Sequence, residues 1–387
     1  MSDMTTMTAA TIGGALIFGM ALGLLGRLKL AVAQSAPVGD GTFRRWLMVL
    51  NITLVPLMLL SGVLIDTYGA RAMLVAGSVI LAMALVGLSR SRITQNAECR
   101  IKDKTSFTFC IGGATALGTA SIVLMPYAFY PVALAAGLSY STAALNLGFV
   151  FIALGALLTP VLTDILLEKI ARRRTLALLA LLALAPAFLG VLPDREHWQM
   201  VEPRGHPSAL LAVPACWLAA LVLFFYVPLE ASIGLWTFSL LAERGQEERA
   251  ATGLLSGFWV AFVASRLMAA LAQLAFSFPR FLWERTLIVV LPLMAAVLLG
   301  NWVGAGQRGR PRGGLILLGL LLGPVLPTLL SLAFHVVPGE KGTAFGLMFA
   351  FGSVGSMVLA PFLSLRLPIV LALLVAASAL VLGLIMS

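Results

Sequence analysis

Long apolar stretches, separated by short polar or charged linkers, fill the chain. A helix needs about 20 mostly apolar residues to cross a bilayer. Twelve stretches of roughly this length occur, at 10–33, 45–66, 71–89, 107–130, 141–167, 174–193, 209–241, 251–276, 283–303, 312–336, 341–363 and 367–386. None alternates apolar and polar residues with the period of two that marks a membrane-spanning β-barrel. The pattern therefore predicts an all-α membrane protein with 12 transmembrane helices.

The longest polar stretches, 90–106 and 193–208, interrupt this pattern. The second lies between the sixth and seventh apolar stretches, at the middle of the chain. It predicts three parts, namely an N-terminal six-helix bundle at 1–193, a central loop at 194–208 and a C-terminal six-helix bundle at 209–387.

An internal repeat supports this division. A shift of 201 residues without gaps brings 112–162 onto 313–363, with ten identical positions. The identical pairs are Gly112/Gly313, Gly113/Gly314, Leu117/Leu318, Gly118/Gly319, Pro126/Pro327, Thr142/Thr343, Ala143/Ala344, Leu158/Leu359, Pro160/Pro361 and Leu162/Leu363. The glycines and prolines carry most weight, because they set close helix contacts and backbone bends. The two halves are therefore predicted to be pseudo-symmetric.

The composition narrows the class of protein. Hydrophobic residues make up 60% of the 387 and charged residues only 11%, against about 45–50% and ~25% in soluble domains. This excludes a soluble enzyme, a disulfide scaffold and a disordered binder. The lipid bilayer is an expected partner, and the expected location is a multi-pass position in a plasma or inner membrane.

The net charge of +10 does not indicate nucleic-acid binding, because the basic stripe with interleaved aromatic residues is missing. We interpret it as loop charge that faces water and anionic headgroups. The three cysteines and three histidines show no metal-ligand spacing. We therefore expect no metal and no cofactor, with proton or sodium coupling left open.

One local motif connects the second and third apolar stretches: Gly62-Val-Leu-Ile-Asp66-Thr-Tyr-Gly69-Ala-Arg71. Gly62 permits close helix approach, and Gly69 permits a bend with positive φ. Asp66 can meet either Arg71 or the N-terminus of a neighbouring helix, where negative charge is favoured.

This motif resembles the Gly-x-Leu-x-Asp-x-x-Gly-x-Arg signature of the major facilitator superfamily. The resemblance implies a loop that latches one half against the other and opens during alternating access. A plain helical hairpin with a solvated Asp–Arg pair is the alternative interpretation.

Further stretches resemble the fucose permease-like sugar transporter branch of this family. They are Ala143-Ala-Leu-Asn146-Leu-Gly148 with Gly155-Ala-Leu-Leu-Thr-Pro160, Tyr226-Val-Pro-Leu-Glu230-Ala-Ser-Ile-Gly234-Leu-Trp236 with Phe258-Trp259 and Arg266, and Gly323-Pro324-Val-Leu-Pro327-Thr328 with Gly342-Thr-Ala-Phe-Gly346. Proton-coupled sugar members carry acidic residues in the first and fourth spans, whereas these spans contain no carboxylate here.

Ionisable residues at membrane depth are costly and are candidates for function. Glu230 and Arg266 lie well inside the seventh and eighth spans. They either face a central substrate cavity, with Glu230 as the candidate for proton coupling, or form a structural salt bridge between adjacent helices.

Four other polar or aromatic residues are candidates for the substrate cavity. Asn51 and Asn146 offer the donors and acceptors that a sugar needs, although they can equally bond neighbouring helices. Tyr127 and Trp236 can stack on a ligand ring or anchor their helices at the membrane interface.

The membrane orientation stays open at this point. The family places the Asp66 loop in the cytoplasm, which would put six of the 26 Lys and Arg residues inside and nineteen outside. Basic residues normally favour the cytoplasmic side, so an inverted orientation is the alternative. Cysteine labelling of 90–106 in intact cells distinguishes the two, since labelling there requires an external loop.

These observations favour a secondary active or facilitative transporter that moves a small polar solute, by resemblance a sugar, through rocking of two halves. An exporter of amphipathic drug-like or lipid-like compounds is the alternative. The sequence has no GxxxxGK[ST] phosphate loop and no HExxH or GxSxG motif, so neither ATP-driven transport nor an enzyme is expected. The expected working form is a monomer.

Overall fold

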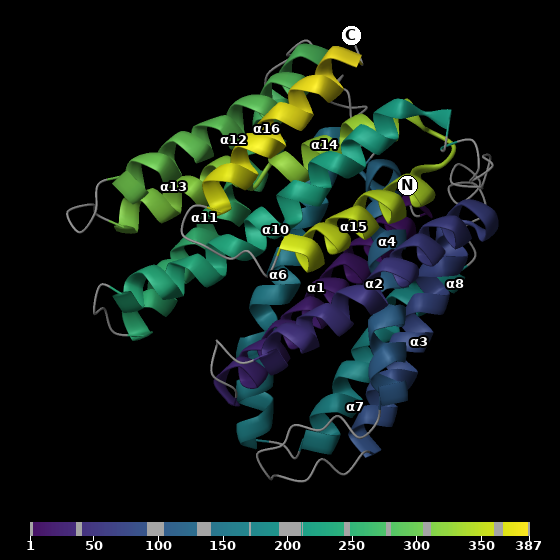
Figure 1. Cartoon of the computed structure of the whole chain (residues 1–387). Coiled ribbons are helices and arrows are strands. Elements are labelled where there is room, and N and C mark those ends of the chain that lie inside the picture. The colour runs from purple at the N-terminus through teal and green to yellow at the C-terminus, as the bar shows by residue number, and fades with distance from the viewer. Residues whose placement is uncertain are drawn as a thin grey trace. The chain divides into compact units, whose positions relative to one another are not determined.

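The computed structural model describes residues 3–35, 41–90, 104–129, 141–169, 172–192, 210, 212–243, 248–275, 280–304, 311–359 and 367–385. The regular elements in these ranges are all helices (Figure 1). Within these described ranges, twelve spans are long and apolar enough to cross a membrane. The all-α fold class with 12 transmembrane helices is confirmed, and the chain is a multi-pass integral membrane protein.

The first six spans are formed by seven helices, because the sixth consists of two. They are α1 (Asp3–Ser35), α2 (Gly41–Tyr68), α3 (Ala70–Arg90), α4 (Lys104–Ala128), α6 (Ser141–Lys169), α7 (Arg172–Ala183) and α8 (Ala185–Val191). The last six spans likewise use seven helices. They are α10 (Pro214–Glu243), α11 (Glu248–Ala275), α12 (Arg280–Gly304), α13 (Pro311–Leu322), α14 (Val325–Val336), α15 (Lys341–Leu359) and α16 (Leu367–Ile385).

The sixth and tenth spans are interrupted for local reasons. Proline lacks a backbone N–H and clashes with the preceding helical turn. Pro186 follows the break between α7 and α8, and Gly323-Pro324 separates α13 from α14. The seventh apolar stretch, by contrast, is the single helix α10.

The chain divides into two compact units. The first comprises Met1–Pro131, Gly148–Pro207 and Gly339–Gly346; the second comprises Val132–Leu147, Ser208–Pro338 and Leu347–Ser387. Two helices therefore change unit along their length. The start of α6 belongs to the second unit, and the start of α15 belongs to the first.

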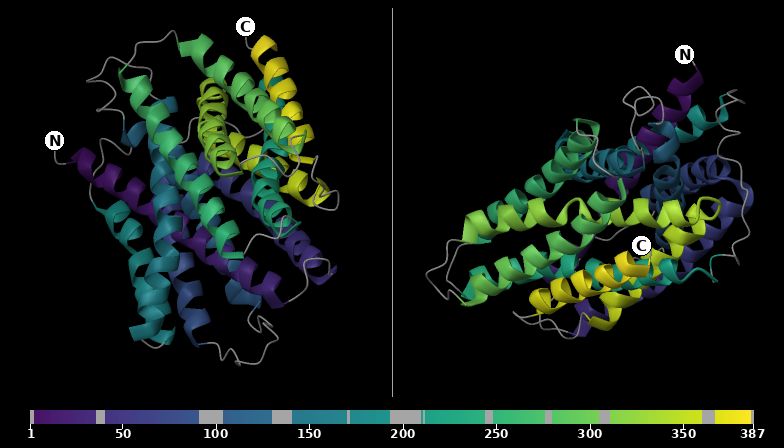
Figure 2. Two further views of the ribbon diagram at one scale, coloured as in Figure 1. Left: turned by 90° about the vertical axis from the view of Figure 1, so that its left-hand side faces the viewer. Right: turned by 90° about the horizontal axis from the view of Figure 1, so that it is seen from above.

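Helix pairing inside the two units follows the predicted repeat. In the first unit α4 packs on α1 and α2, while α3 packs on α7 and α1 packs on α8. Six spans later, α14 packs on α10, α13 on α11, α12 on α16 and α10 on α16. The same span pairs thus recur in both units. In Figure 2 the helices of the first half of the chain run from purple to teal, and those of the second half run from green to yellow. This recurrence agrees with two pseudo-symmetric six-helix halves.

Small residues let the helices within a unit approach closely. A Cβ added at Gly113 on α4 would lie 2.5 Å from the Leu81 nitrogen, and one at Gly77 on α3 would lie 2.5 Å from the Leu117 nitrogen. Large apolar side chains such as Met83, Leu181 and Phe188 are exposed instead. This distribution is typical of helices that pack on each other through small residues and present large ones to lipid.

Candidate functional site

The connection between α2 and α3 consists of Gly69 alone. Its φ of 91° lies in the left-handed region, which residues with a Cβ rarely adopt. The predicted bend with positive φ is therefore confirmed at this position. It brings Asp66, on the last turn of α2, to the end of the helix.

Asp66 is buried and binds the N-terminus of α15. Its Oδ1 accepts a hydrogen bond from the Gly342 backbone N–H at 2.9 Å, and its Oδ2 accepts one from the Thr343 N–H at 2.6 Å. The first N–H groups of a helix lack partners within the helix and carry partial positive charge. Of the two predicted partners for Asp66, the helix N-terminus is the one these bonds establish. We call this contact the Asp66 clasp.

Close backbone packing surrounds the Asp66 clasp. A Cβ added at Gly342 would lie 2.6 Å from the Gly62 carbonyl oxygen, and one at Gly346 would lie 2.5 Å from the Met58 carbonyl oxygen. A Cβ added at Gly62 would collide with the Gly342 carbonyl oxygen. Gly62 therefore permits close helix approach, as predicted, and its partner is α15.

Arg71 of the same motif binds the end of the sixth span. Its Nε donates to the Gly190 carbonyl at 2.7 Å, and a terminal guanidinium nitrogen donates to the Leu192 carbonyl at 3.0 Å. These carbonyls lie at the C-terminal end of α8, where a cation is favoured. Arg71 thus ties the start of α3 to α8.

Tyr127 lies beside the start of α15. The Lys341 ammonium donates to its hydroxyl at 2.8 Å and stands 4.4 Å from the centre of its ring. The sequence allows Tyr127 either to stack on a ligand ring or to anchor its helix at the membrane interface. Its contact in this structure is with a lysine at the helix start that Asp66 also binds.

A second acidic contact, which the sequence did not reveal, lies in the second unit. Glu284 near the start of α12 is buried and accepts a hydrogen bond from the Thr142 hydroxyl on the first turn of α6. The Thr142 Oγ1 also lies 2.6 Å from the Ser331 Oγ on α14. We call this group, Glu284 with Thr142 and Ser331, the Glu284 clasp.

The internal repeat relates the two clasps. Thr142 and Thr343 are one of its identical pairs. Each lies in the first turn of a helix that changes unit, and each is bound by a buried carboxylate. The second half has no copy of the Asp66 motif. In that half, the carboxylate that binds Thr142 comes from Glu284 on α12. The repeat pair was therefore the signal that could have led to Glu284.

We expect Glu284 and Thr142 to be energetically coupled. Glu284→Ala and Thr142→Val should each lower the melting temperature by several degrees, because each removes a buried hydrogen bond to a carboxylate. The double variant should lose little more than the worse single variant. Thr67→Val removes an exposed hydroxyl that bonds its own helix and should change the melting temperature little. Losses that simply add up would contradict a direct interaction.

Glu230 and Arg266 lie in one polar cluster of the second unit. Arg266 on α11 is buried, and its Nε donates to the Gly323 carbonyl at 2.9 Å, at the break between α13 and α14. The Tyr226 hydroxyl donates to the neighbouring Leu322 carbonyl at 2.8 Å. Glu230 lies one turn after Tyr226 on α10, half-buried, and its charge interacts with that of Arg266. We call Tyr226, Glu230 and Arg266 the Glu230 cluster.

The remaining predicted residues lie apart from that cluster. Asn146 on α6 is fully buried, and its Nδ2 donates to the Thr142 carbonyl at 2.9 Å. Its Oδ1 has no hydrogen-bond partner among the described residues. Asn51 is half-buried on α2. Trp236 belongs to α10, but its side chain lies outside the described residues. No group of three potential metal ligands occurs in the described part of the chain.

The model of the Major Facilitator Superfamily matches residues 4–361. The chain belongs to the major facilitator superfamily. Members of this family are transporters rather than enzymes, so the chain is a transporter. No curated protein matches the transporter by sequence.

Solved structures share the fold of the transporter. The E. coli fucose:proton symporter FucP aligns with a TM-score of 0.70 at 15% identity, over 100% of this chain and 99% of its own. The proton:xylose symporter XylE, bound to 6-bromo-6-deoxy-D-glucose, aligns with a TM-score of 0.67 at 15% identity, over 100% and 95%. The human organic anion transporter MFSD10 aligns with a TM-score of 0.68 at 17% identity, over 99% of both chains.

Proposed function

We propose that the transporter moves a small polar solute of the sugar class across the membrane by alternating access. The observation that carries the substrate class is the buried Asn146 Oδ1, which has no hydrogen-bond partner among the described residues. Buried polar atoms are nearly always hydrogen-bonded. A solute hydroxyl would supply the missing donor, and the sugar symporters FucP and XylE share the fold.

In this proposal, the Asp66 clasp and the Glu284 clasp control from which side of the membrane the solute can reach its site. Each binds the start of a helix, α6 or α15, that changes unit a few residues later, after Leu147 or Gly346. Both contacts use buried carboxylates, which accept strong hydrogen bonds. Opening of the clasps would release both helix starts together when access changes sides.

In this proposal, the Glu230 cluster couples movement of the solute to proton binding. Glu230 interacts with Arg266, and its carboxyl group can bind and release a proton. Arg266 and Tyr226 hold the interrupted backbone of the tenth span through the Gly323 and Leu322 carbonyls. A change of charge at Glu230 would therefore act on a broken helix, the element at which transporters commonly place substrate and ion sites.

Export of amphipathic organic anions is the second candidate. Arg266 stands 4.3 Å from the centre of the Phe262 ring. Phe258, Trp259 and Phe262 pack together with ring centres 5.1 to 5.7 Å apart. A cation next to an aromatic cluster suits an anion with an apolar body, and the organic anion transporter MFSD10 shares the fold.

A thermal-shift screen of purified protein tests both candidates, since a ligand that binds only the folded state raises its melting temperature. We expect a sugar to stabilise the wild type and to bind Asn146→Ala about tenfold more weakly, because one hydrogen bond to a buried group is lost. Asn301→Ala, at an exposed position on α12, should bind like the wild type. Stabilisation by amphipathic anions but by no sugar would favour the second candidate instead.

A further inference from the structure

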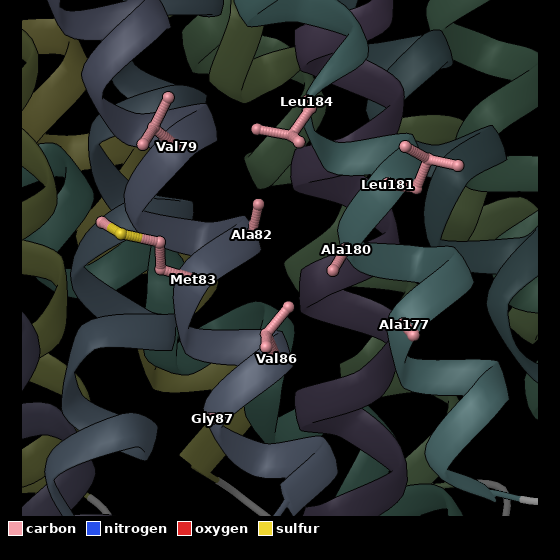
Figure 3. A pocket seen from close by; sticks show the side chains of 9 residues that line it. All are labelled: Val79, Ala82, Met83, Val86, Gly87, Ala177, Ala180, Leu181 and Leu184. Carbon is pink, nitrogen blue, oxygen red and sulfur yellow. The ribbon is translucent and has the colours of Figure 1, made fainter.

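An apolar groove of about 540 Å³ lies between α3 and α7 in the first unit (Figure 3). All nine residues that line it are apolar. In Figure 3, Val79 and Leu184 lie toward one end, and Gly87 and Ala177 lie toward the other. This order shows that α3 and α7 run antiparallel along the groove.

The groove has the length of a single leaflet. Gly87 lies eight positions after Val79 on α3, which corresponds to about 12 Å at 1.5 Å per residue. Half of a typical hydrocarbon core is about 15 Å. Both flanking segments belong to membrane spans, Ala70–Ser89 and Arg174–Val191. The groove therefore lies at the depth of lipid tails on one side of the membrane.

Positive charge marks one end of the groove. Ala177 lies one helical turn from Arg174, which is exposed. Arg174 completes a run of three consecutive arginines in the first turn of α7. Apolar depth with the exposed Arg174 at its mouth matches the two parts of a lipid with a negative headgroup.

We propose that this groove binds an anionic phospholipid, with one acyl chain between α3 and α7 and the phosphate at Arg174. The small side chains of Ala82 and Ala180 leave room for the chain, and the larger side chains around them contact it. Either membrane orientation is compatible with this site, because the groove and Arg174 lie on the same side of the membrane in both orientations. If that face is cytoplasmic, as the positive charge favours, the leaflet beside it is the more anionic one.

Native mass spectrometry of the purified transporter with phosphatidylglycerol or phosphatidylcholine tests the acyl-chain part. We expect the wild type to retain phosphatidylglycerol, and Ala177→Phe, which fills the groove from an exposed position, to reduce the bound fraction at least fivefold. Ala76→Phe places the same side chain at an exposed position of α3 outside the groove and should leave binding unchanged. An equal decrease in bound phosphatidylglycerol in both variants, or no decrease in either, would overturn the proposal.

The headgroup part is tested by charge. Arg174→Gln should weaken phosphatidylglycerol binding about fivefold, since one basic residue near an anionic surface contributes about that factor. Arg174→Lys should keep most of the binding, and phosphatidylcholine should bind weakly to every variant. Equal affinity of the wild type for both lipids would contradict a headgroup site.

A dimer that Ala177→Phe dissociates, without change in bound lipid, would identify a second copy as the occupant and overturn the proposal.

Discussion

Glu230→Gln is expected to abolish accumulation of the transported solute against its gradient. The variant keeps the size and shape of the side chain but cannot carry a negative charge or exchange a proton. Arg266 would then lack the opposite charge with which it interacts. Exchange of solute down its gradient should continue, because the pathway is unchanged. Uptake into proteoliposomes with and without a proton gradient measures both.

The matched control is Glu230→Asp, which keeps the charge and should retain part of the accumulation. A Glu230→Gln variant that accumulates solute with the pH dependence of the wild type would show that Glu230 has no role in coupling. Loss of exchange together with loss of accumulation would instead point to substrate binding or to the salt bridge that the sequence also allowed. The two readouts therefore separate these roles.

Asp66→Asn is expected to slow turnover at least tenfold while changing substrate affinity little. The charge of Asp66 supports two hydrogen bonds to the start of α15. Bonds to a charged group contribute about 1.5–3 kcal/mol each to stability, and asparagine offers one neutral acceptor in their place. The state in which Asp66 binds the start of α15 becomes less populated. The side chain of Asn146, the proposed substrate contact, does not change, so affinity should change little. Counterflow rates and ligand-dependent melting curves give turnover and affinity separately.

Glu340→Gln is the control for Asp66→Asn. It removes a carboxylate that immediately precedes the same helix, and its charge acts on Asp66 only through space. We expect a small effect on transport from this change. An unaltered transport rate in Asp66→Asn would show that the clasp is a static helix contact with no part in alternating access.

The fold could be predicted almost completely from the sequence. Lipid acts as the solvent, so the boundaries of apolar stretches carry most of the information on helices. The motif around Asp66 was recognisable because its glycines set local backbone geometry, as the φ of Gly69 shows. The choice between Arg71 and a helix N-terminus as the partner of Asp66 was not accessible, because the N-terminus comes from residues more than 270 positions away.

The site was predictable only where a residue is unusual for its surroundings. Glu230 and Arg266 stand out as charges at membrane depth, and both belong to the Glu230 cluster. Glu284 did not stand out, because it lies near the start of an apolar stretch, where charge is common. Its partner Thr142 is an ordinary helix residue 142 positions away. Only the pairing of Thr142 with Thr343 in the repeat linked it to the Asp66 clasp.

Alternating access through the Asp66 clasp requires that this clasp opens during transport. Thr343→Cys, in a variant without the three native cysteines, keeps the backbone N–H that Asp66 binds. Thr343 is buried, so its thiol should react slowly with a maleimide in proteoliposomes. We predict that the solute found by thermal shift changes this rate severalfold, and that Asp66→Asn raises the rate without solute. The same slow rate under all three conditions would contradict alternating access through this clasp.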